Sequence, residues 1–344
     1  MESGCYTALI TPFRDDTVDE KGLERLVEFQ MLNGVSGIVA VGTTGESPTL
    51  GWEEHNQVTE RIARMIKGKG LCIAGTGSNN TAETLAATGH SVKAGAEALL
   101  LVDPYYNGPS SLEIRKEYIE PVARQFPDTI VIPYVVPGRT GTQIQPEDVA
   151  LASERFPNVR AVKDATGNFD NMRRTRECCG DNFAILSGDD NLTCRMVADP
   201  LIKACGVISV YANIFPGAMS QMVAAAARGE SEVAGRLEKQ LGPLLELVTV
   251  TTTETSPHGP VMCRARNPLP VKTLMAVLGM PSGKCRRPLG KMTAAGLEKL
   301  LAAAREILAA SPELFAPLAA FFGIDVEARL KDPAVFKSLI YASY

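Results

Sequence analysis

Three residues of this 344-residue chain could together carry out covalent chemistry on a small 2-oxo acid. Lys163 directly follows the run Val159–Val162, and desolvation at such a strand end favours the neutral amine, a nucleophile suited to a ketone carbon. Tyr134 ends the preceding apolar run, and its phenol could pass protons to and from an adduct on that amine. Arg139 follows in a Pro-Gly turn, where its planar guanidinium matches a carboxylate.

Each of these residues also has an ordinary structural role open to it. An isolated strand-end lysine more often reaches solvent or pairs with a neighbour such as Asp164, a tyrosine packs, and a loop arginine is a solvated charge. The segment 42–46 (GTTGE) offers hydroxyls and backbone amides that could hold a carboxylate or relay a proton, although Thr and Gly also form plain turns. The chemical prediction therefore rests on all three segments together.

Short apolar runs alternate along the chain with longer stretches of helical period, a pattern typical of βα units. Eight strands are expected, at Gly4–Ile10, Gly37–Val41, Gly70–Ala74, Ala98–Val102, Thr129–Val135, Val159–Val162, Phe183–Leu186 and Gly206–Val210. Amphipathic helices are expected between them, at Glu20–Asn33, Trp52–Lys67, Thr81–Ala94, Ser111–Gln125, Gln145–Arg155, Phe169–Cys179 and Leu192–Ala204.

This rhythm predicts an α/β protein of the (β/α)8 TIM-barrel class. Active sites of such barrels lie at the carboxyl ends of the strands, where Lys163 and Tyr134 stand. An open doubly wound sheet would usually carry a GxGxxG motif after its first strand, and the segment 75–80 (GTGSNN) lacks the third glycine.

The chain beyond the eighth strand shows helical patterns only. We expect a catalytic barrel over residues 1–215, a C-terminal helical domain over 216–310 and an appended tail over 311–344. The helices are expected at Ala218–Arg228, Glu232–Val248, Val271–Leu278 and Ala294–Ala310. The Thr- and Pro-containing stretch Thr249–Arg266 predicts a loop, and Ser311–Tyr344 predicts short helices.

Composition argues against several classes of function. The net charge of -4 and the interspersed charges of both signs argue against a nucleic-acid partner. No apolar run approaches the roughly 18 residues that span a bilayer, and no basic leader precedes Tyr6, so we expect a cytoplasmic protein with no membrane partner. The eight cysteines and three histidines lack metal-ligand spacing, which predicts free thiols and neither a metal nor a cofactor.

Seven segments resemble, in order, the dihydrodipicolinate synthase branch of the N-acetylneuraminate lyase family of pyruvate-dependent class I aldolases. They are Gly42–Ser47, Asp103–Asn107, Tyr134–Thr140, Val162–Asn168, Ser187–Asp190, Gly206–Val210 and Asn267–Lys272. The likeness covers about residues 3–310. The combination is far more specific than any one segment.

The resemblance implies a mechanism for the residues identified above. Lys163 would form an imine with pyruvate, and the derived enamine would attack L-aspartate 4-semialdehyde to give 4-hydroxy-tetrahydrodipicolinate in diaminopimelate and lysine biosynthesis. Tyr134 would be the acid/base, and Arg139 would bind the semialdehyde carboxylate. Thr44 would link Tyr134 to Tyr106 of a neighbouring subunit within a homotetramer built from tight dimers. The pyruvate pocket would be bounded by Thr43, Thr44, Gly188 and Ile208.

The resemblance also implies a feedback site for lysine at the dimer interface. The positions that match lysine-sensitive members are Ser47, His55, Asn79, Glu83 and Tyr105. A carboxylate with an imidazole nearby could receive the ammonium groups and polar contacts of an amino acid. An exposed helix face or turn would carry several of these polar residues anyway.

Two departures from the family pattern stand out. Val135 follows Tyr134 where the family usually has Asn, which could alter support of the active-site turn. The stretches 249–266 and 311–344 exceed the usual length, which could change the assembly. Neither departure removes a residue of the implied mechanism.

Other functions share the same lysine and tyrosine. N-acetylneuraminate lyase, 2-keto-3-deoxy-gluconate aldolase and 4-hydroxy-2-oxoglutarate aldolase use the same fold and Schiff base, so these do not fix the substrate. Arg139, the Thr43-Thr44 pair and the Tyr105-Tyr106 pair favour the synthase. A non-catalytic amino-acid-binding sensor is a further alternative, against which the presence of Lys163 argues.

Overall fold

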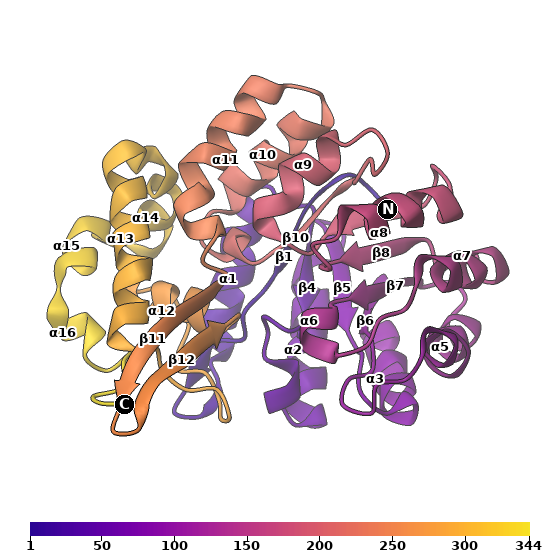
Figure 1. Cartoon of the computed structure of the whole chain (residues 1–344), viewed down its shortest axis with the longest axis horizontal. Helices are drawn as coiled ribbons and strands as arrows, with labels where there is room; N and C mark the ends of the chain where they lie inside the picture. The colour runs from indigo at the N-terminus through magenta and orange to yellow at the C-terminus, as the bar shows by residue number, and fades with distance from the viewer.

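The computed structural model describes residues 1–344, and its centre is a closed barrel of parallel strands (Figure 1). The strands follow the chain order around the barrel, and the last of them pairs with the first. They are β1 (Gly4–Ala8), β4 (Gly37–Ala40), β5 (Leu71–Gly75), β6 (Ala98–Val102), β7 (Ile130–Val135), β8 (Ala161–Asp164), β9 (Ala184–Ser187) and β10 (Gly206–Ser209). The predicted TIM barrel and its eight strands are confirmed.

Strand side chains alternate between the inside of the barrel and the layer beneath the helices, so both faces of each strand are buried. The interior cluster includes Leu100, Ile132, Leu186 and Ile208. The residues between them in sequence, such as Val131, pack outward against the helices in a larger cluster. The same alternation decides which strand-end residues face the site.

Helices surround the barrel between the strands (Figure 1). They are α1 (Glu20–Leu32), α2 (Trp52–Ile66), α3 (Thr81–Ala94), α4 (Ser111–Glu113), η2 (Ile114–Ile119), α5 (Glu120–Gln125), α6 (Pro137–Thr140), α7 (Pro146–Arg155), α8 (Phe169–Cys179) and α9 (Thr193–Ala198). Short elements lie in the connections between strands and helices: β2 (Phe13–Arg14), β3 (Thr17–Val18), η1 (Ser47–Thr49), η3 (Asp190–Leu192) and η4 (Tyr211–Asn213). The predicted helix at Ser111–Gln125 is interrupted by a π turn at η2, between α4 and α5.

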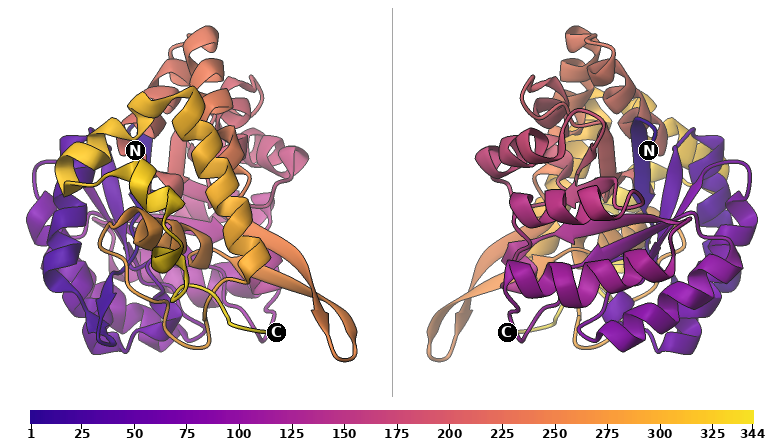
Figure 2. Two further views of the ribbon diagram at one scale, coloured as in Figure 1. Left: turned by 90° about the vertical axis from the view of Figure 1, so that its left-hand side faces the viewer. Right: turned by 90° about the vertical axis from the view of Figure 1, so that its right-hand side faces the viewer.

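The chain continues past the barrel into α10 (Pro216–Ala227), α11 (Ser231–Leu245), α12 (Leu269–Leu278) and α13 (Ala294–Ala310), close to the predicted helices. The predicted loop at Thr249–Arg266 is wrong. Those residues form an antiparallel hairpin of β11 (Thr249–Ser256) and β12 (Gly259–Arg266), which projects from the body of the molecule (Figure 2).

Side chains of the hairpin alternate between more buried and more exposed positions along each strand, as in a sheet with one covered face. Val250 and Thr252 are buried, whereas Thr249, Thr251 and Thr253 are exposed. Threonine is β-branched and fits a pleated, half-buried surface, so a run that looks polar favours a strand. The turn is closed by Gly259, whose φ of 114° suits glycine.

The tail is helical, as predicted, with η5 (Pro312–Leu314), α14 (Ala316–Phe322), α15 (Val326–Lys331) and α16 (Pro333–Phe336). Phe321 and Phe322 of α14 pack against Phe29 of α1. Arg329 of α15 donates hydrogen bonds to the carbonyls of Ala276 and Val277 at the end of α12. The tail is thereby held against both α1 and α12.

Helix α10 packs directly against β1 and β10, so the extension shares its core with the barrel. We propose that residues 1–215, 216–310 and 311–344 are three successive parts of the chain, the first of which forms the barrel strands. None of the helices combines the length and apolar character that crossing a membrane requires.

Candidate active site

Lys163 and Tyr134 lie side by side inside the barrel. β7 and β8 pair in a register that places Tyr134 beside Lys163, and Ala161 and Tyr134 belong to the interior cluster, so Lys163 also faces inward. The Lys163 Nζ lies 4.1 Å from the centre of the Tyr134 ring. Both side chains are buried. An amine held in this way can attack a carbonyl beside a phenol that can transfer protons.

Asn267 connects two loops at the mouth of the barrel. Its Nδ2 donates a hydrogen bond of 2.9 Å to Thr44 Oγ1, and its backbone carbonyl accepts one of 3.1 Å from Arg139 Nη2. The Asn267 Oδ1 is buried without a partner, which leaves it free to accept a hydrogen bond. Sequence reasoning did not identify Asn267 as a site residue, although it begins the matched segment Asn267–Lys272.

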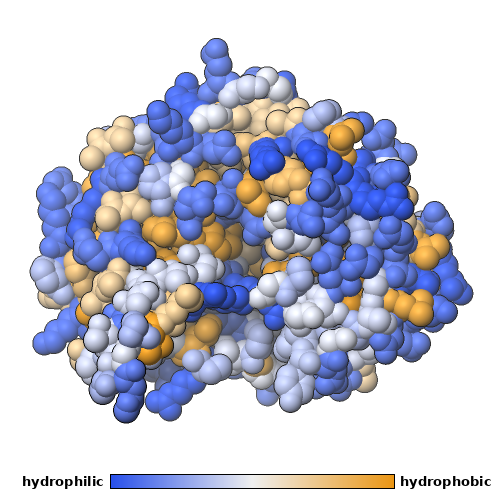
Figure 3. Space-filling view, in the orientation of Figure 1, coloured by the Kyte–Doolittle hydropathy of each residue, from blue (hydrophilic) through white to orange (hydrophobic).

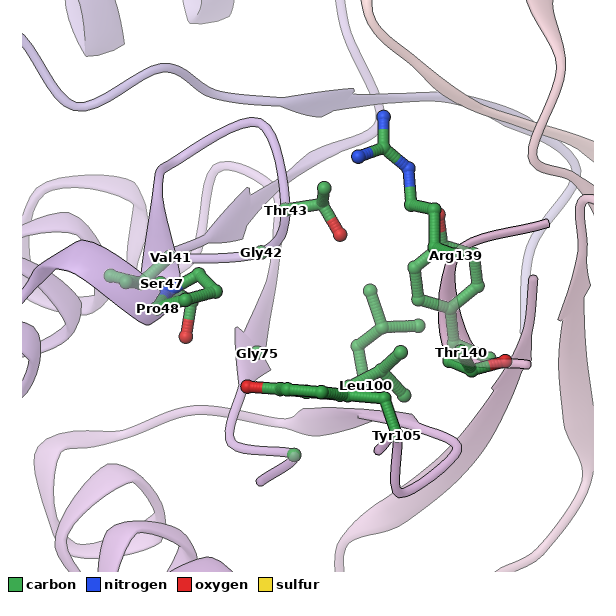
Figure 4. A pocket seen from close by; sticks show the side chains of 13 residues that line it. Val41, Gly42, Thr43, Ser47, Pro48, Gly75, Leu100, Tyr105, Arg139 and Thr140 are labelled. Atoms are coloured by element: carbon green, nitrogen blue, oxygen red, sulfur yellow. The ribbon is translucent and has the colours of Figure 1, made fainter. Parts of the chain in front are cut away.

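A cavity of about 220 Å³ opens beside Tyr134 and Arg139 (Figure 4). In the close-up, Thr43 and Arg139 lie on one side and the Tyr105 ring lies across the other. The lining residues are Val41, Gly42, Thr43, Ser47, Pro48, Gly75, Gly77, Leu100, Val102, Tyr105, Tyr134, Arg139 and Thr140. Lys163 is not among them, but its Nζ lies against the ring of Tyr134, which does line the cavity. The surface view shows a hollow in the middle of this face, with apolar residues beside it (Figure 3).

Of the predicted pocket residues, Thr43 lines this cavity, whereas Thr44, Gly188 and Ile208 do not. Gly188 follows β9 and Ile208 lies in β10, the two strands beyond Lys163. Ile208 is fully buried in the barrel interior. Gly188 N–H donates to Asp164 O at 2.7 Å, and a Cβ at Gly188 would lie 2.6 Å from the Cβ of Ala165. The close approach of the two backbones therefore requires glycine at this position.

Asp189 brings a carboxylate near the predicted amine and guanidinium. Burial raises the pKa of Asp189, and the charges of Lys163 and Arg139 act in the opposite direction. Burial lowers the pKa of Arg139, with the charges of Tyr134 and Asp189 acting against it. The mutual influence of these groups is consistent with Asp189 and Arg139 lying near one another in a partly buried site. Asp189 is a second residue that sequence reasoning did not assign.

The predicted proton link through Thr44 is not formed within one chain. The Thr44 hydroxyl accepts from Asn267, and no hydrogen bond joins it to Tyr134 or Tyr106. Tyr106 is 93% exposed, and its φ of 76° lies in the left-handed region. Its side chain thus points away from its own site and is accessible to another molecule.

The predicted lysine-site residues are partly brought together. Ser47 and Tyr105 line the cavity, and Asn79 Oδ1 accepts the Tyr105 N–H at 2.8 Å. His55 is buried, and its Nε2 lies 2.9 Å from the carbonyl of Gly75, which also lines the cavity. Burial lowers the pKa of His55 to about 4. Glu83 is exposed and accepts a hydrogen bond from Ser78.

Val135 does not face the site. Its side chain packs in the layer between barrel and helices, whereas Tyr134 and Val136 on either side face the interior. The expected effect of this departure on the turn would therefore act through packing behind β7.

Comparisons with known proteins agree with the geometry. The model of the "Dihydrodipicolinate synthetase family" matches residues 1–307. This chain belongs to that family. A 4-hydroxy-tetrahydrodipicolinate synthase of Methanothrix thermoacetophila is 42% identical over 295 residues, 85% of this chain and 92% of the relative.

Solved structures of the dihydrodipicolinate synthetase family share the fold. A dihydrodipicolinate synthase from Acinetobacter baumannii complexed with pyruvate is 34% identical, with a TM-score of 0.80 and coverage of 89% of this chain and 99% of its own. A structure from Cyanidioschyzon merolae with lysine bound is 33% identical, with a TM-score of 0.79 and coverage of 89% and 98%. The family resemblance predicted from the seven segments is confirmed.

One buried ion pair joins the mouth of this family member to its C-terminal extension. Lys272 Nζ of α12 lies 2.5 Å from Glu46 Oε1 and also donates to the Thr11 carbonyl. Glu46 Oε2 accepts the backbone N–H of Arg286 at 2.9 Å. Both charged side chains are fully buried. The loop that carries Thr43 and Thr44 is thus held in place by Lys272 and Arg286 of the extension.

Proposed function

We propose that Lys163 carries out the reaction of the 4-hydroxy-tetrahydrodipicolinate synthases in this chain, a lyase-type condensation of pyruvate with L-aspartate 4-semialdehyde. The observation that carries the proposal is the contact of the Lys163 amine with the Tyr134 ring inside the barrel, beside a cavity bordered by Arg139. Family membership and the pyruvate complex of a relative support it.

The first half of the reaction forms a covalent intermediate. Lys163 Nζ attacks C2 of pyruvate, and loss of one water from the carbinolamine gives an imine. Tyr134 supplies a proton to the departing oxygen and afterwards removes one from C3, which converts the imine to an enamine. We propose Thr43, which lines the cavity, together with Thr44, Gly188 and Ile208 as the residues that bound the space for this three-carbon unit.

The second half joins the semialdehyde. The enamine carbon attacks the aldehyde carbon, and the substrate amine then attacks C2 and displaces Lys163, which closes the ring and regenerates the free amine. Arg139 binds the carboxylate of the semialdehyde in a charge-assisted hydrogen bond. Its guanidinium donates to the Asn267 carbonyl, which restricts where it can lie at the edge of the cavity.

The assembly we propose is a homotetramer of tight dimers. Tyr106 is exposed in the single chain and its predicted partner Thr44 has no contact with it, so a neighbouring subunit would supply the phenol. A completed relay would then run from Tyr134 through Thr44 to the neighbour's copy of Tyr106.

Lysine is the proposed feedback inhibitor. Ser47 and Tyr105 line the same cavity as Thr43 and Arg139, so an amino acid bound near them would lie next to the active site. The neutral imidazole of His55 and the exposed carboxylate of Glu83 are suited to contact its ammonium groups. The lysine-bound structure of a relative supports this proposal.

The test is intact-mass spectrometry after addition of pyruvate and sodium borohydride, with peptide mapping, followed by a coupled assay with L-aspartate 4-semialdehyde. We expect one reduced pyruvate adduct on Lys163 and turnover with the semialdehyde. Lys163→Met should lose both, and Lys203→Met, which removes an exposed lysine paired with Asp181, should lose neither. No adduct on the unaltered protein would refute the mechanism. An adduct without turnover would point to another aldehyde, as in the related aldolases.

A further inference from the structure

Asp103 is a buried carboxyl group that has no part in the mechanism described so far. It follows β6 and is fully buried. Its Oδ2 accepts the backbone N–H of Ile144 at 3.1 Å, whereas its Oδ1 is buried without a partner. Its own backbone N–H donates to the carbonyl of Tyr134 at 3.2 Å. Asp103 therefore contacts both the strand of the acid/base residue and the loop beyond Arg139.

The two segments that Asp103 connects run alongside each other at the barrel mouth. The segment 103–111 carries Tyr105 and Tyr106, and the segment 137–145 carries Arg139. Two other hydrogen bonds join them: Thr142 Oγ1 donates to the Pro109 carbonyl, and the Gln145 N–H donates to Ser111 Oγ at 2.8 Å. Of these three links, only the one from Asp103 is fully buried, and a buried bond to a carboxylate is the costliest to break.

We propose that Asp103 is a positioning residue, which fixes the turn of Arg139 relative to the Tyr105-Tyr106 segment so that the guanidinium meets the carboxylate of the second substrate. The inference rests on the proposed function, because it assigns Arg139 to that substrate. The contact of Asp103 with Tyr134 is made by its backbone N–H and does not depend on the side chain, so loss of the carboxyl link to Ile144 leaves pyruvate binding intact. Displacement of a binding group by about 1 Å is enough to weaken its action strongly.

Two other buried aspartates show what is particular to Asp103. Asp164 accepts hydrogen bonds from Thr166 on one oxygen and from Asn171 on the other. Asp190 accepts the N–H groups of Val210 and Tyr211. The Asp103 carboxyl group accepts from one donor only, the Ile144 N–H. Its contact with the segment 137–145 therefore depends on a single oxygen.

The surroundings of Asp103 contain little charge. Burial raises its pKa to about 7, and the Ile144 N–H acts in the opposite direction. No charged neighbour contributes to that shift. Burial raises the pKa of Tyr118 in the adjacent η2, and the charge of Asp103 adds to this rise. An asparagine keeps the acceptor oxygen and removes the ionisation, which makes it the conservative variant for a test.

The experiment compares Asp103→Ala, Asp103→Asn and Asn158→Ala in steady-state kinetics and in borohydride trapping. Asn158 is a matched control, because its Nδ2 donates to three carbonyls at the opposite end of β7, those of Ala123, Phe126 and Thr129. We expect Asp103→Ala to raise KM for the semialdehyde about tenfold, as for a misplaced binding group, with KM for pyruvate and the adduct on Lys163 unchanged. Asp103→Asn should restore the semialdehyde KM to within about threefold of the unaltered protein.

The outcomes separate this inference from the proposed function. An unchanged semialdehyde KM in Asp103→Ala would overturn the inference, and so would equal rises in Asp103→Ala and Asn158→Ala, since that reports general loosening of the fold. An Asp103→Asn variant as impaired as Asp103→Ala would also overturn it, because the acceptor oxygen is retained. Failure of the unaltered protein to trap pyruvate would instead refute the proposed function.

Discussion

The mouth of the barrel and the C-terminal extension are held in place by different kinds of polar contact. At the mouth, buried carboxylates at strand ends accept backbone N–H groups, as Asp103, Asp164 and Asp190 do. In the extension, long arginine side chains nearer the surface donate to backbone carbonyls, as Arg329 and Arg305 do. The hairpin adds a sheet with one covered face and one face in solvent.

The mouth is the more precisely fixed of the two regions. A buried polar group in low dielectric is costly to leave unpaired, so each contact at the mouth restricts its loop to one arrangement. Contacts near the surface compete with water and are weaker. We therefore expect changes at the mouth to alter activity, and changes in the extension to alter stability alone, with the Glu46–Lys272 pair coupling the two regions.

The largest effect is expected from Tyr134→Phe. The substitution removes the phenol and keeps the ring that packs on Lys163, so kcat should fall by roughly 10² to 10⁴, the usual contribution of a general acid or base. The melting temperature should stay close to that of the unaltered protein. Steady-state kinetics and thermal denaturation of the same sample measure both. A variant that loses stability and keeps its rate would contradict the contrast between the regions.

Lys272→Met is expected to destabilise both the barrel mouth and the C-terminal extension. It leaves Glu46 buried without its counter-ion, which should lower the free energy of unfolding by about 3–5 kcal/mol. Urea denaturation measures the loss. Adding Glu46→Gln removes the unpaired charge, and the double variant should recover a large part of the stability. If the double variant is no more stable than Lys272→Met, the pair does not join the regions as described.

The ionisation of Asp103 should appear in the pH dependence of stability. Its folded pKa of about 7 lies above the ordinary value of 3.8, so the unfolded chain releases this proton first. The stability that the neutral carboxyl contributes is present below about pH 4 and is lost as pH rises to about 7. The melting temperature of the unaltered protein should therefore fall across this range relative to Asp103→Asn. Parallel curves for the two proteins would show that this group keeps one charge state.

The smallest effect is expected from Arg329→Ala in the tail. It removes hydrogen bonds to the last carbonyls of α12, which should lower the free energy of unfolding by about 1 kcal/mol and leave kcat and both KM values unchanged. Lys337→Ala, a change in the same tail, is the control, since no hydrogen bond or ion pair of its side chain is found. A change in the semialdehyde KM would show that the tail influences the mouth.

Sequence patterns predicted most of the barrel, because alternation of apolar runs and helical stretches is a local property of the chain. They placed the strands within two residues and put Lys163 and Tyr134 at adjacent strand ends, where the register now pairs them. The hairpin was missed for a local reason too: its buried positions include Thr252, and a threonine-rich run looks polar whether or not it forms a strand.

Other parts of the site depend on contacts between distant residues. Asn267 meets Thr44 across 223 positions of the chain, and Asp103 meets Ile144 across 41. Sequence periodicity does not predict such pairings, because each side chain alone is equally suited to a turn or a helix cap. The exposed Tyr106 also shows that a residue predicted for the site can point away from it in the single chain.

Closure of the barrel through β1 and β10 has a consequence for synthesis on the ribosome. Gly4 pairs with Gly206, so about 200 residues must be translated before the first strand meets its last neighbour. At about 5–20 residues per second this takes roughly 10–40 s. Throughout that time the nascent chain presents an unpaired edge of β1, which is a template for pairing with other chains. The order of strands around the barrel thus sets an interval during which the emerging polypeptide depends on protection from aggregation.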